Sequence, residues 1–160
     1  MNRLFQQPCI DLNGLRALSS DLAGRSRAGD VILLIGDLGS GKTTFARAFI
    51  QSLGVTEDVP SPTFTLLQTY EGRAESGPLP IYHFDLYRLE RPQDLYELDF
   101  EDALDEGVSL IEWPEVAMAL LPEERLEIRL EPGPDAESRA VTISGSGTWA
   151  ERLQDIGGGS

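Results

Sequence analysis

The chain has 160 residues, of which 41% are hydrophobic and 25% are charged, as in an ordinary soluble globular protein. Its formal net charge of −14 at pH 7 repels phosphate backbones, which argues against direct, independent binding of nucleic acid. The longest apolar runs, such as residues 31–35, are far too short to cross a bilayer, so no membrane-spanning helix is expected.

Helical and strand patterns alternate through the first part of the chain. Residues 11–29 have leucines at helical spacing, with Asp11 positioned to cap the start of the helix and Gly29 to end it. Residues 30–37 form a continuous apolar run of strand length, which is typical of a strand covered on both faces. Residues 43–54 are amphipathic and predict a second helix.

The rest of the chain adds five strand patterns, at residues 64–70, 81–88, 108–115, 125–131 and 140–144. Residues 71–80 are rich in turn formers and predict a connection between the first two of these strands. Residues 91–107 have helical spacing, and Thr148 with Glu151 forms a weak capping box for a last short helix. The final two strand patterns flank a turn and predict an antiparallel hairpin.

This order of elements predicts one α/β domain over residues 1–160, with a mostly parallel central sheet, antiparallel edge strands and a C-terminal β-hairpin. Residues 157–160 are expected to form a flexible tail. No secretory pattern opens the chain, and Cys9 is its only cysteine, so a reducing, cytoplasmic compartment is expected.

The segment GDLGSGKTT contains the GxxxxGK[ST] pattern of a phosphate-binding loop, from Gly36 to Thr43. An apolar strand precedes it and a helical pattern follows it, which is the context that this motif needs. Glycines let backbone N–H groups turn toward phosphate oxygens, and the helix N-terminus adds partial positive charge. Lys42, the only lysine in a chain with twelve arginines, offers the compact charge that phosphates need, and Thr43 offers a hydroxyl to magnesium.

The nucleotide is expected to be an adenine nucleotide. Guanine-specific proteins of this kind use an Asn/Thr-Lys-x-Asp motif on a later strand, and this chain has no second lysine to form one. No LSGGQ-type segment occurs either, which argues against a transporter ATPase. Arg139 and the segment near Asp11 are candidates to approach the base.

Two carboxylates close buried strand patterns, Asp85 in IYHFDLYR and Glu112 in VSLIEWPE. Either can bind magnesium, directly or through water, and either can orient an attacking water. His83 is more readily a structural hydrogen-bonding group than a base. Trp113 either flanks the nucleotide or fills the core, and Thr63 either senses the terminal phosphate or only starts a strand.

Four motifs in this order and spacing, GDLGSGKTT, SPTF, HFDLYR and IEWPE, resemble the bacterial TsaE family over about Asp30 to Glu115. Members of that family are small ATPases of the tRNA threonylcarbamoyladenosine modification pathway. The resemblance implies a P-loop NTPase fold, binding of ATP and Mg²⁺, and slow hydrolysis that depends on partners called TsaB and TsaD. TsaD transfers the threonylcarbamoyl group to tRNA, so no independent tRNA binding by this chain is expected.

The resemblance also implies roles for particular residues. Thr43 and Glu112 would hold magnesium, Asp85 would support hydrolysis, and Thr63 would lie in a switch-like loop. The expected catalytic residues are Lys42, Asp85, Glu112 and Thr63. The expected phosphate-binding residues are Gly36, Asp37, Leu38, Gly39, Ser40, Gly41, Lys42, Thr43 and Thr44.

Two other functions fit a phosphate-binding loop. A small-molecule kinase shares the size and the fold, but it needs an acceptor pocket and an arginine-bearing lid, for which Arg88 and Arg91 are the nearby candidates. A non-enzymatic module whose partner binding is gated by nucleotide would bind ATP with negligible turnover. The fate of the terminal phosphate separates the three.

Overall fold

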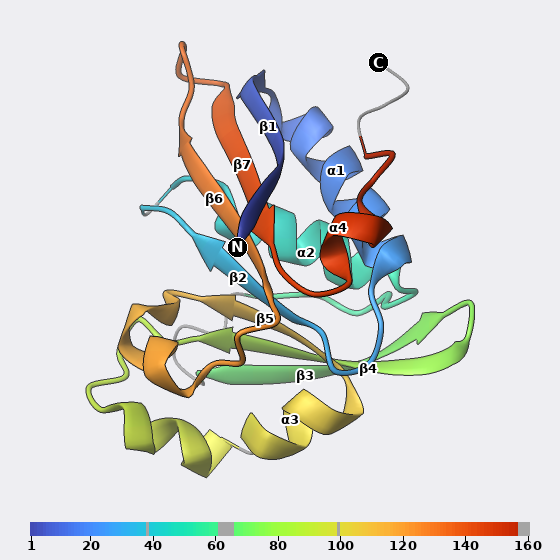
Figure 1. Ribbon diagram of the computed structural model, residues 1–160, viewed down its shortest axis with the longest axis vertical. Coiled ribbons are helices and arrows are strands. Elements are labelled where there is room, and N and C mark those ends of the chain that lie inside the picture. Colours follow the sequence, from blue (N-terminus) through green and yellow to red (C-terminus); the bar gives the residue numbers. More distant parts are fainter. Residues whose placement is uncertain (38, 61–65, 99, 157–160) are drawn as a thin grey trace.

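A seven-stranded sheet runs through the middle of the molecule (Figure 1). The computed structural model describes residues 1–37, 39–60, 66–98 and 100–156. Within them the strands lie in the order β1-β7-β6-β2-β5-β4-β3. They are β1 (Asn2–Ile10), β2 (Val31–Ile35), β3 (Leu67–Ala74), β4 (Gly77–Asp85), β5 (Val108–Glu112), β6 (Leu126–Pro132) and β7 (Arg139–Gly145).

The four central strands β6, β2, β5 and β4 are parallel to one another. Antiparallel strands flank them, with β3 beside β4 at one edge and the pair β7 and β1 at the other. The predicted parallel centre, antiparallel edges and β6–β7 hairpin are therefore confirmed. Because β2, β4 and β5 run in the same direction, their carboxyl ends lie together at one end of the strands, where ligands of such sheets bind.

Helices cover the sheet on both faces (Figure 1). One face carries α1 (Leu12–Arg25), α2 (Lys42–Ser52) and the short α4 (Trp149–Arg152), and the other carries α3 (Phe100–Glu106) and the 3-10 helices η1 (Pro92–Leu98) and η2 (Pro114–Leu120).

The sequence of β2 shows why both layers form. Ile32 and Leu34 pack into the core under α1 and α2, whereas Val31 and Leu33 pack into the core under α3 and η2. All four side chains are fully buried. The unbroken apolar run thus serves two cores at once, as predicted for a strand covered on both faces.

The first helix begins where it was predicted, but it does not extend to the predicted end at Gly29. The Asp11 carboxylate accepts the N–H of Gly14 at 2.7 Å, so Asp11 is the N-cap of α1 as predicted. The helix ends at Arg25, four residues before Gly29, and the backbone N–H of Ser26 closes its last turn on the carbonyl of Ala23.

Three local predictions were wrong or incomplete. Residues 71–80 are mostly strand, because β3 extends to Ala74, β4 begins at Gly77, and the two strands pair from Leu67 and Phe84 to Ala74 and Gly77. The helical pattern of residues 91–107 is divided between η1 and α3. The capping box does not form: the Thr148 side chain caps no N–H of α4 and accepts a hydrogen bond from Arg152 Nε at 3.1 Å instead.

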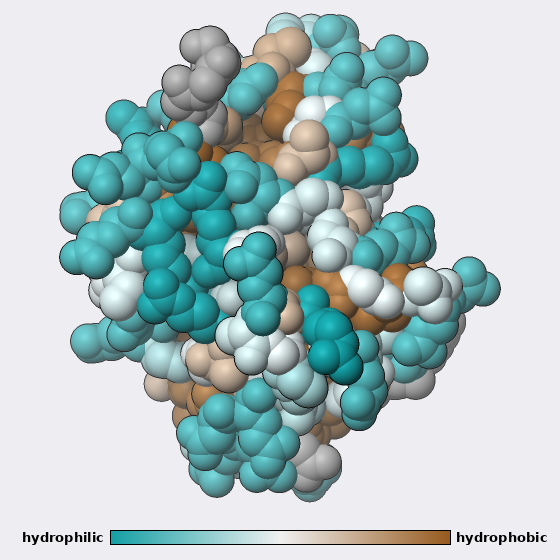
Figure 2. Space-filling model, turned by 90° about the vertical axis from the view of Figure 1, so that its right-hand side faces the viewer, coloured by the Kyte–Doolittle hydropathy of each residue, from teal (hydrophilic) through white to brown (hydrophobic). Residues whose placement is uncertain are grey.

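The strand β1 was not predicted, because its apolar residues are scattered. Among the described strands it pairs with β7 alone and lies at the edge of the sheet, so most of its side chains are exposed. Most of the surface seen in Figure 2 is hydrophilic, in keeping with the charge of −14. In the described parts of the chain, every helix is too short or too polar to cross a membrane. The tail predicted at residues 157–160 lies outside the described residues.

Candidate functional site

The connection between β2 and α2 has glycine where the backbone requires it. Gly39 and Gly41 have φ values of 78° and 108°, in the left-handed region that side chains disfavour. A Cβ added at Gly36 would lie 2.6 Å from the carbonyl oxygen of Leu130, which excludes any side chain there. Gly41 is also the N-cap of α2, so the positive end of that helix begins where the loop closes.

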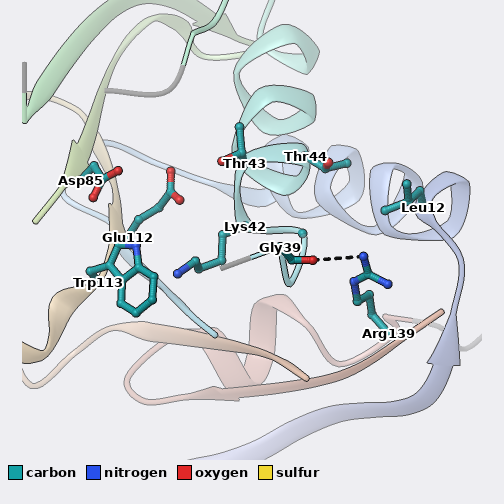
Figure 3. Close-up of a pocket in the computed structure, with 10 residues that line it drawn as sticks. Leu12, Gly39, Lys42, Thr43, Thr44, Asp85, Glu112, Trp113 and Arg139 are labelled. Atoms are coloured by element: carbon teal, nitrogen blue, oxygen red, sulfur yellow. Dashed lines mark hydrogen bonds between the residues drawn. The ribbon is translucent and has the colours of Figure 1, made fainter. Parts of the chain in front are cut away.

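A cavity of about 250 Å³ lies at this loop, beside the carboxyl ends of β4 and β5 (Figure 3). It brings together five of the predicted phosphate-binding residues and both strand-end acids. Its lining consists of Leu12, Gly39, Gly41, Lys42, Thr43, Thr44, Asp85, Glu112, Trp113 and Arg139.

Lys42 is held at the mouth of the loop. Its side chain is buried, and Nζ donates to the carbonyl oxygen of Gly36 at 2.5 Å. Nζ also lies 3.2 Å from the ring centre of Trp113, a cation–π contact. Burial lowers the pKa of Lys42, against the attraction of nearby carboxylates. Those carboxylates are, in decreasing order of effect, Glu112, Asp85, Glu115 and Asp37.

Trp113 belongs to the site and not to the core. Its ring lines the cavity, covers Lys42, and lies 4.9 Å from the ring of Tyr87. The backbone of Trp113 has a φ of 55°, which is uncommon for a residue with a large side chain. Of the two alternatives left open by the sequence, the structure therefore supports a position that flanks the ligand.

Asp85 and Glu112 are the last residues of β4 and β5 and lie opposite each other in the parallel pairing. Both are buried, with 4% and 2% of their surfaces exposed. Figure 3 shows both carboxylates on the same side of the loop as Lys42 and Thr43. The parallel register thus places at one edge two acids that are 27 residues apart in the sequence, as their strand-end positions predicted.

His83 holds one of these acids. Its Nε2 lies 2.6 Å from Oε2 of Glu112, and both side chains are almost fully buried. With an ionised carboxylate as acceptor, Nε2 carries the proton and donates it to the hydrogen bond. The predicted structural hydrogen bond of His83 is confirmed, and its partner is a candidate catalytic residue.

Three predicted phosphate-binding residues lie in the loop but do not line this cavity. The carbonyl of Gly36 accepts from Lys42, and the carbonyl of Asp37 accepts the N–H of Ser40 at 3.1 Å. Asp37 and Ser40 line an adjoining hollow of about 220 Å³ together with Arg139. Leu38 and Thr63, and with Thr63 the whole SPTF motif, lie outside the described residues, so their predicted roles stay predictions.

Two cavity residues come from outside the four motifs. Leu12 opens α1, and Arg139 opens β7. Figure 3 shows both at the end of the cavity away from Asp85 and Glu112. Their place agrees with the expectation that Arg139 and the segment near Asp11 approach the base. The sequence indicated these positions only by residue type, a cationic side chain and an apolar one. Because both are far from the loop along the chain, the sequence did not predict that they contact it.

The donor groups fit a magnesium ion that is bound together with phosphates. Among the described residues, no group of three or more His, Cys, Asp or Glu side chains could hold a metal by itself. The Thr43 hydroxyl and the Glu112 and Asp85 carboxylates are oxygen ligands of the kind that Mg²⁺ prefers. Mg²⁺ usually takes one or two protein ligands and completes its shell with water and phosphate oxygens, so this small set suffices.

Comparisons with known proteins agree with the geometry. The family model described as "Threonylcarbamoyl adenosine biosynthesis protein TsaE" matches residues 10–141. The tRNA threonylcarbamoyladenosine biosynthesis protein TsaE of Bacillus subtilis is 41% identical over 138 residues, 86% of this chain and 84% of that protein. The protein of the same name from Streptomyces coelicolor is 40% identical over 141 residues, 85% of this chain and 94% of that protein.

The crystal structure of Bacillus subtilis YdiB is similar to this structure, with a TM-score of 0.77 and 34% sequence identity. The match covers 97% of this chain and 94% of that chain. Together with the strand order, it confirms the predicted fold class, an α/β sheet of the P-loop kind.

Proposed function

The chain belongs to the TsaE family of tRNA threonylcarbamoyladenosine biosynthesis, and we propose that within this pathway it binds and hydrolyses ATP with Mg²⁺ and acts on a TsaB–TsaD complex. One observation carries the proposal. Lys42 and Thr43 at the start of α2 share a single cavity with the strand-end acids Asp85 and Glu112. This is the set of groups that positions and neutralises a transferring phosphoryl group in P-loop enzymes.

The loop and Lys42 bind the phosphates in this proposal. The N-terminus of α2 and the glycine-shaped loop offer backbone N–H groups and partial positive charge. Lys42 exchanges its hydrogen bond to the Gly36 carbonyl for one to a phosphate oxygen, while Trp113 keeps the ammonium group close to the site. The cost of moving Nζ is small, because one oxygen acceptor replaces another.

The two acids have different roles in this proposal. Thr43 and Glu112 would hold a magnesium ion, directly or through water, and Asp85 would orient the attacking water. The ion, when bound, would supply positive charge to the phosphate oxygens. His83 binds Oε2 of the Glu112 carboxylate and so holds this carboxylate in one orientation.

The charge distribution of the cavity supports dependence on a partner. Among the described residues that line it, the cationic side chains are Lys42 and Arg139. Figure 3 shows Arg139 at the end of the cavity away from Asp85 and Glu112, so of these two cations Lys42 is the one beside the acids. P-loop enzymes that lack an additional cation are slow until a partner supplies charge or orders a loop. We therefore expect this chain to hydrolyse ATP slowly by itself and faster with TsaB and TsaD. Thr63, in the SPTF loop, is the proposed sensor of the terminal phosphate.

The net charge of −14 supports a division of labour in which the partner complex, and not this chain, contacts tRNA. The lone Cys9 fits a reducing compartment, and we place the protein in the cytoplasm with the tRNA that the pathway modifies.

The fate of the terminal phosphate of ATP tests the reaction type. ATP labelled at that position is incubated with the chain, Mg²⁺ and the TsaB–TsaD complex, and the products are separated. Label in inorganic phosphate is the expected result. Label on an organic acceptor would identify a kinase, and ATP that binds without release of label would identify a nucleotide-gated binding module.

Replacing His83 by leucine is expected to lower partner-stimulated hydrolysis about tenfold, because groups that orient a metal ligand have effects of this size. His83→Gln is expected to keep most of the rate, since its side-chain amide can donate from near the position of Nε2. The measurements are the turnover rate and the Mg²⁺ concentration for half-maximal ATP binding. Equal losses in the leucine and glutamine variants would contradict the positioning role.

A further inference from the structure

Arg139 joins two segments that are far apart in the sequence. Its Nε donates to the carbonyl oxygen of Ser40 at 3.0 Å, and its Nη2 donates to that of Gly39 at 3.1 Å (Figure 3 shows the second bond). Its Nη1 donates to the carbonyls of Ser138 and Ala136, at 3.0 and 3.3 Å. The guanidinium thus binds the β2–α2 loop on one side and the β6–β7 connection on the other.

Arg139 binds carbonyl groups of the loop, which a bound phosphate does not contact. A phosphate-binding loop turns N–H groups toward the anion, so its carbonyl groups must point elsewhere and find donors. In a planar trans peptide, C=O and N–H point in opposite directions. Holding the Ser40 carbonyl on the Arg139 side therefore directs the N–H of Gly41 away from Arg139, the side on which Figure 3 shows Lys42.

The geometry of the guanidinium suits this task. Two adjacent carbonyls are bound by two N–H groups of one rigid planar fork, an arrangement that a lysine ammonium does not reproduce. The loop otherwise relies on glycines, whose backbone freedom must be lost when the loop orders. A fixed cation on the sheet lowers that cost before any ligand arrives.

We propose that Arg139 is a positioning residue for the phosphate-binding loop, and that it holds the Gly39 and Ser40 carbonyls so that the loop is preformed for a polyphosphate. The proposal rests on the ATP binding proposed above and adds a role for the β6–β7 hairpin. It differs from the expectation that Arg139 approaches the base, because it assigns the effect to the phosphates.

A ligand without a base separates these roles. Binding of ATP and of inorganic tripolyphosphate, each with Mg²⁺, is measured by calorimetry on the native chain and on Arg139→Gln and Arg139→Lys. The matched control is Arg73→Gln, which removes the same charge from an exposed position on the edge strand β3. Measurements are made well below each variant's own Tm, so a contribution to overall stability alone leaves the affinities unchanged.

Arg139→Gln is expected to weaken binding of both ligands by a similar factor of about tenfold, the change that follows from loss of one charged hydrogen-bonding contact. Arg139→Lys is expected to recover only part of this loss, and Arg73→Gln is expected to stay within about twofold of the native chain. Should Arg139→Gln fail to fold, the partial loss in Arg139→Lys carries the same comparison.

Other results overturn the proposal. A loss confined to ATP would place Arg139 at the base or ribose, and unchanged affinities would limit it to supporting the hairpin. A native chain that binds ATP but not tripolyphosphate would show that the loop contributes too little for Arg139 to act through it. A native chain that binds neither ligand would instead overturn the proposed ATP function itself.

Discussion

Replacing Lys42 by alanine is expected to abolish measurable partner-stimulated ATP hydrolysis, with a loss of at least about a hundredfold. Lys42 is the only lysine of the chain and, of the two described cations that line the cavity, the one that lies beside Asp85 and Glu112. Its removal leaves the phosphate charge without a direct counter-charge from the protein where charge develops during transfer. The turnover rate with saturating TsaB–TsaD and the affinity for ATP are both measured.

The control for Lys42→Ala is Arg16→Ala, which removes one positive charge from an exposed site on α1. The Nη1 of Arg16 donates a hydrogen bond to the Asn13 side chain on the same helix, away from the cavity, so the control tests for a general effect of net charge. Retention of full stimulated turnover by Lys42→Ala would contradict the assignment of the loop to ATP. Lys42→Arg is expected to remain impaired, because a longer planar guanidinium does not reproduce the compact charge that Nζ places between the Gly36 carbonyl and the Trp113 ring.

Replacing Glu112 by glutamine is expected to reduce stimulated hydrolysis by at least about a hundredfold, because a metal-facing charge is lost at a buried position. The substitution keeps the size of the side chain, and the glutamine amide oxygen can still accept the hydrogen bond from His83. The loss therefore reports the charge and not a disrupted core. Thermal unfolding without ligand checks that the fold is kept.

Comparison with Asp85→Asn separates the roles of the two acids. Glu112→Gln is expected to raise the Mg²⁺ concentration needed for half-maximal ATP binding, whereas Asp85→Asn is expected to slow turnover and leave that concentration nearly unchanged. The opposite pattern would exchange the roles and contradict the assignment of Glu112 to the metal.

The position of the phosphate-binding loop and of the two strand-end acids was the most predictable part of the candidate site. The loop motif required an apolar strand before it and a helix after it, and the structure has β2 and α2 there. Asp85 and Glu112 were recognised because each closes a buried strand, and parallel strands bring their carboxyl ends to one edge. The two acids lie close together only if their strands are neighbours. The structure shows that β4 and β5 are neighbours, with Asp85 opposite Glu112.

Features that depend on contacts distant in sequence were less predictable. The strand β1 carries scattered apolar residues, because among the described strands it pairs with β7 alone at the sheet edge and needs no continuous buried face. The contact of Arg139 with the loop spans about a hundred residues and arises from the strand order β7-β6-β2. The turn formers of residues 71–80 were outweighed by cross-strand pairing of β3 with β4, a tertiary effect that local propensity does not contain.

The most direct test of the central claim is inorganic phosphate release from ATP and Mg²⁺ by the chain alone, with purified TsaB and TsaD, and by Glu112→Gln with the same complex. We expect slow release alone, at least about tenfold faster release with the complex, and almost none from the variant. Release that the complex does not stimulate, or that Glu112→Gln retains in full, would contradict the proposal of a partner-dependent ATPase built on this site.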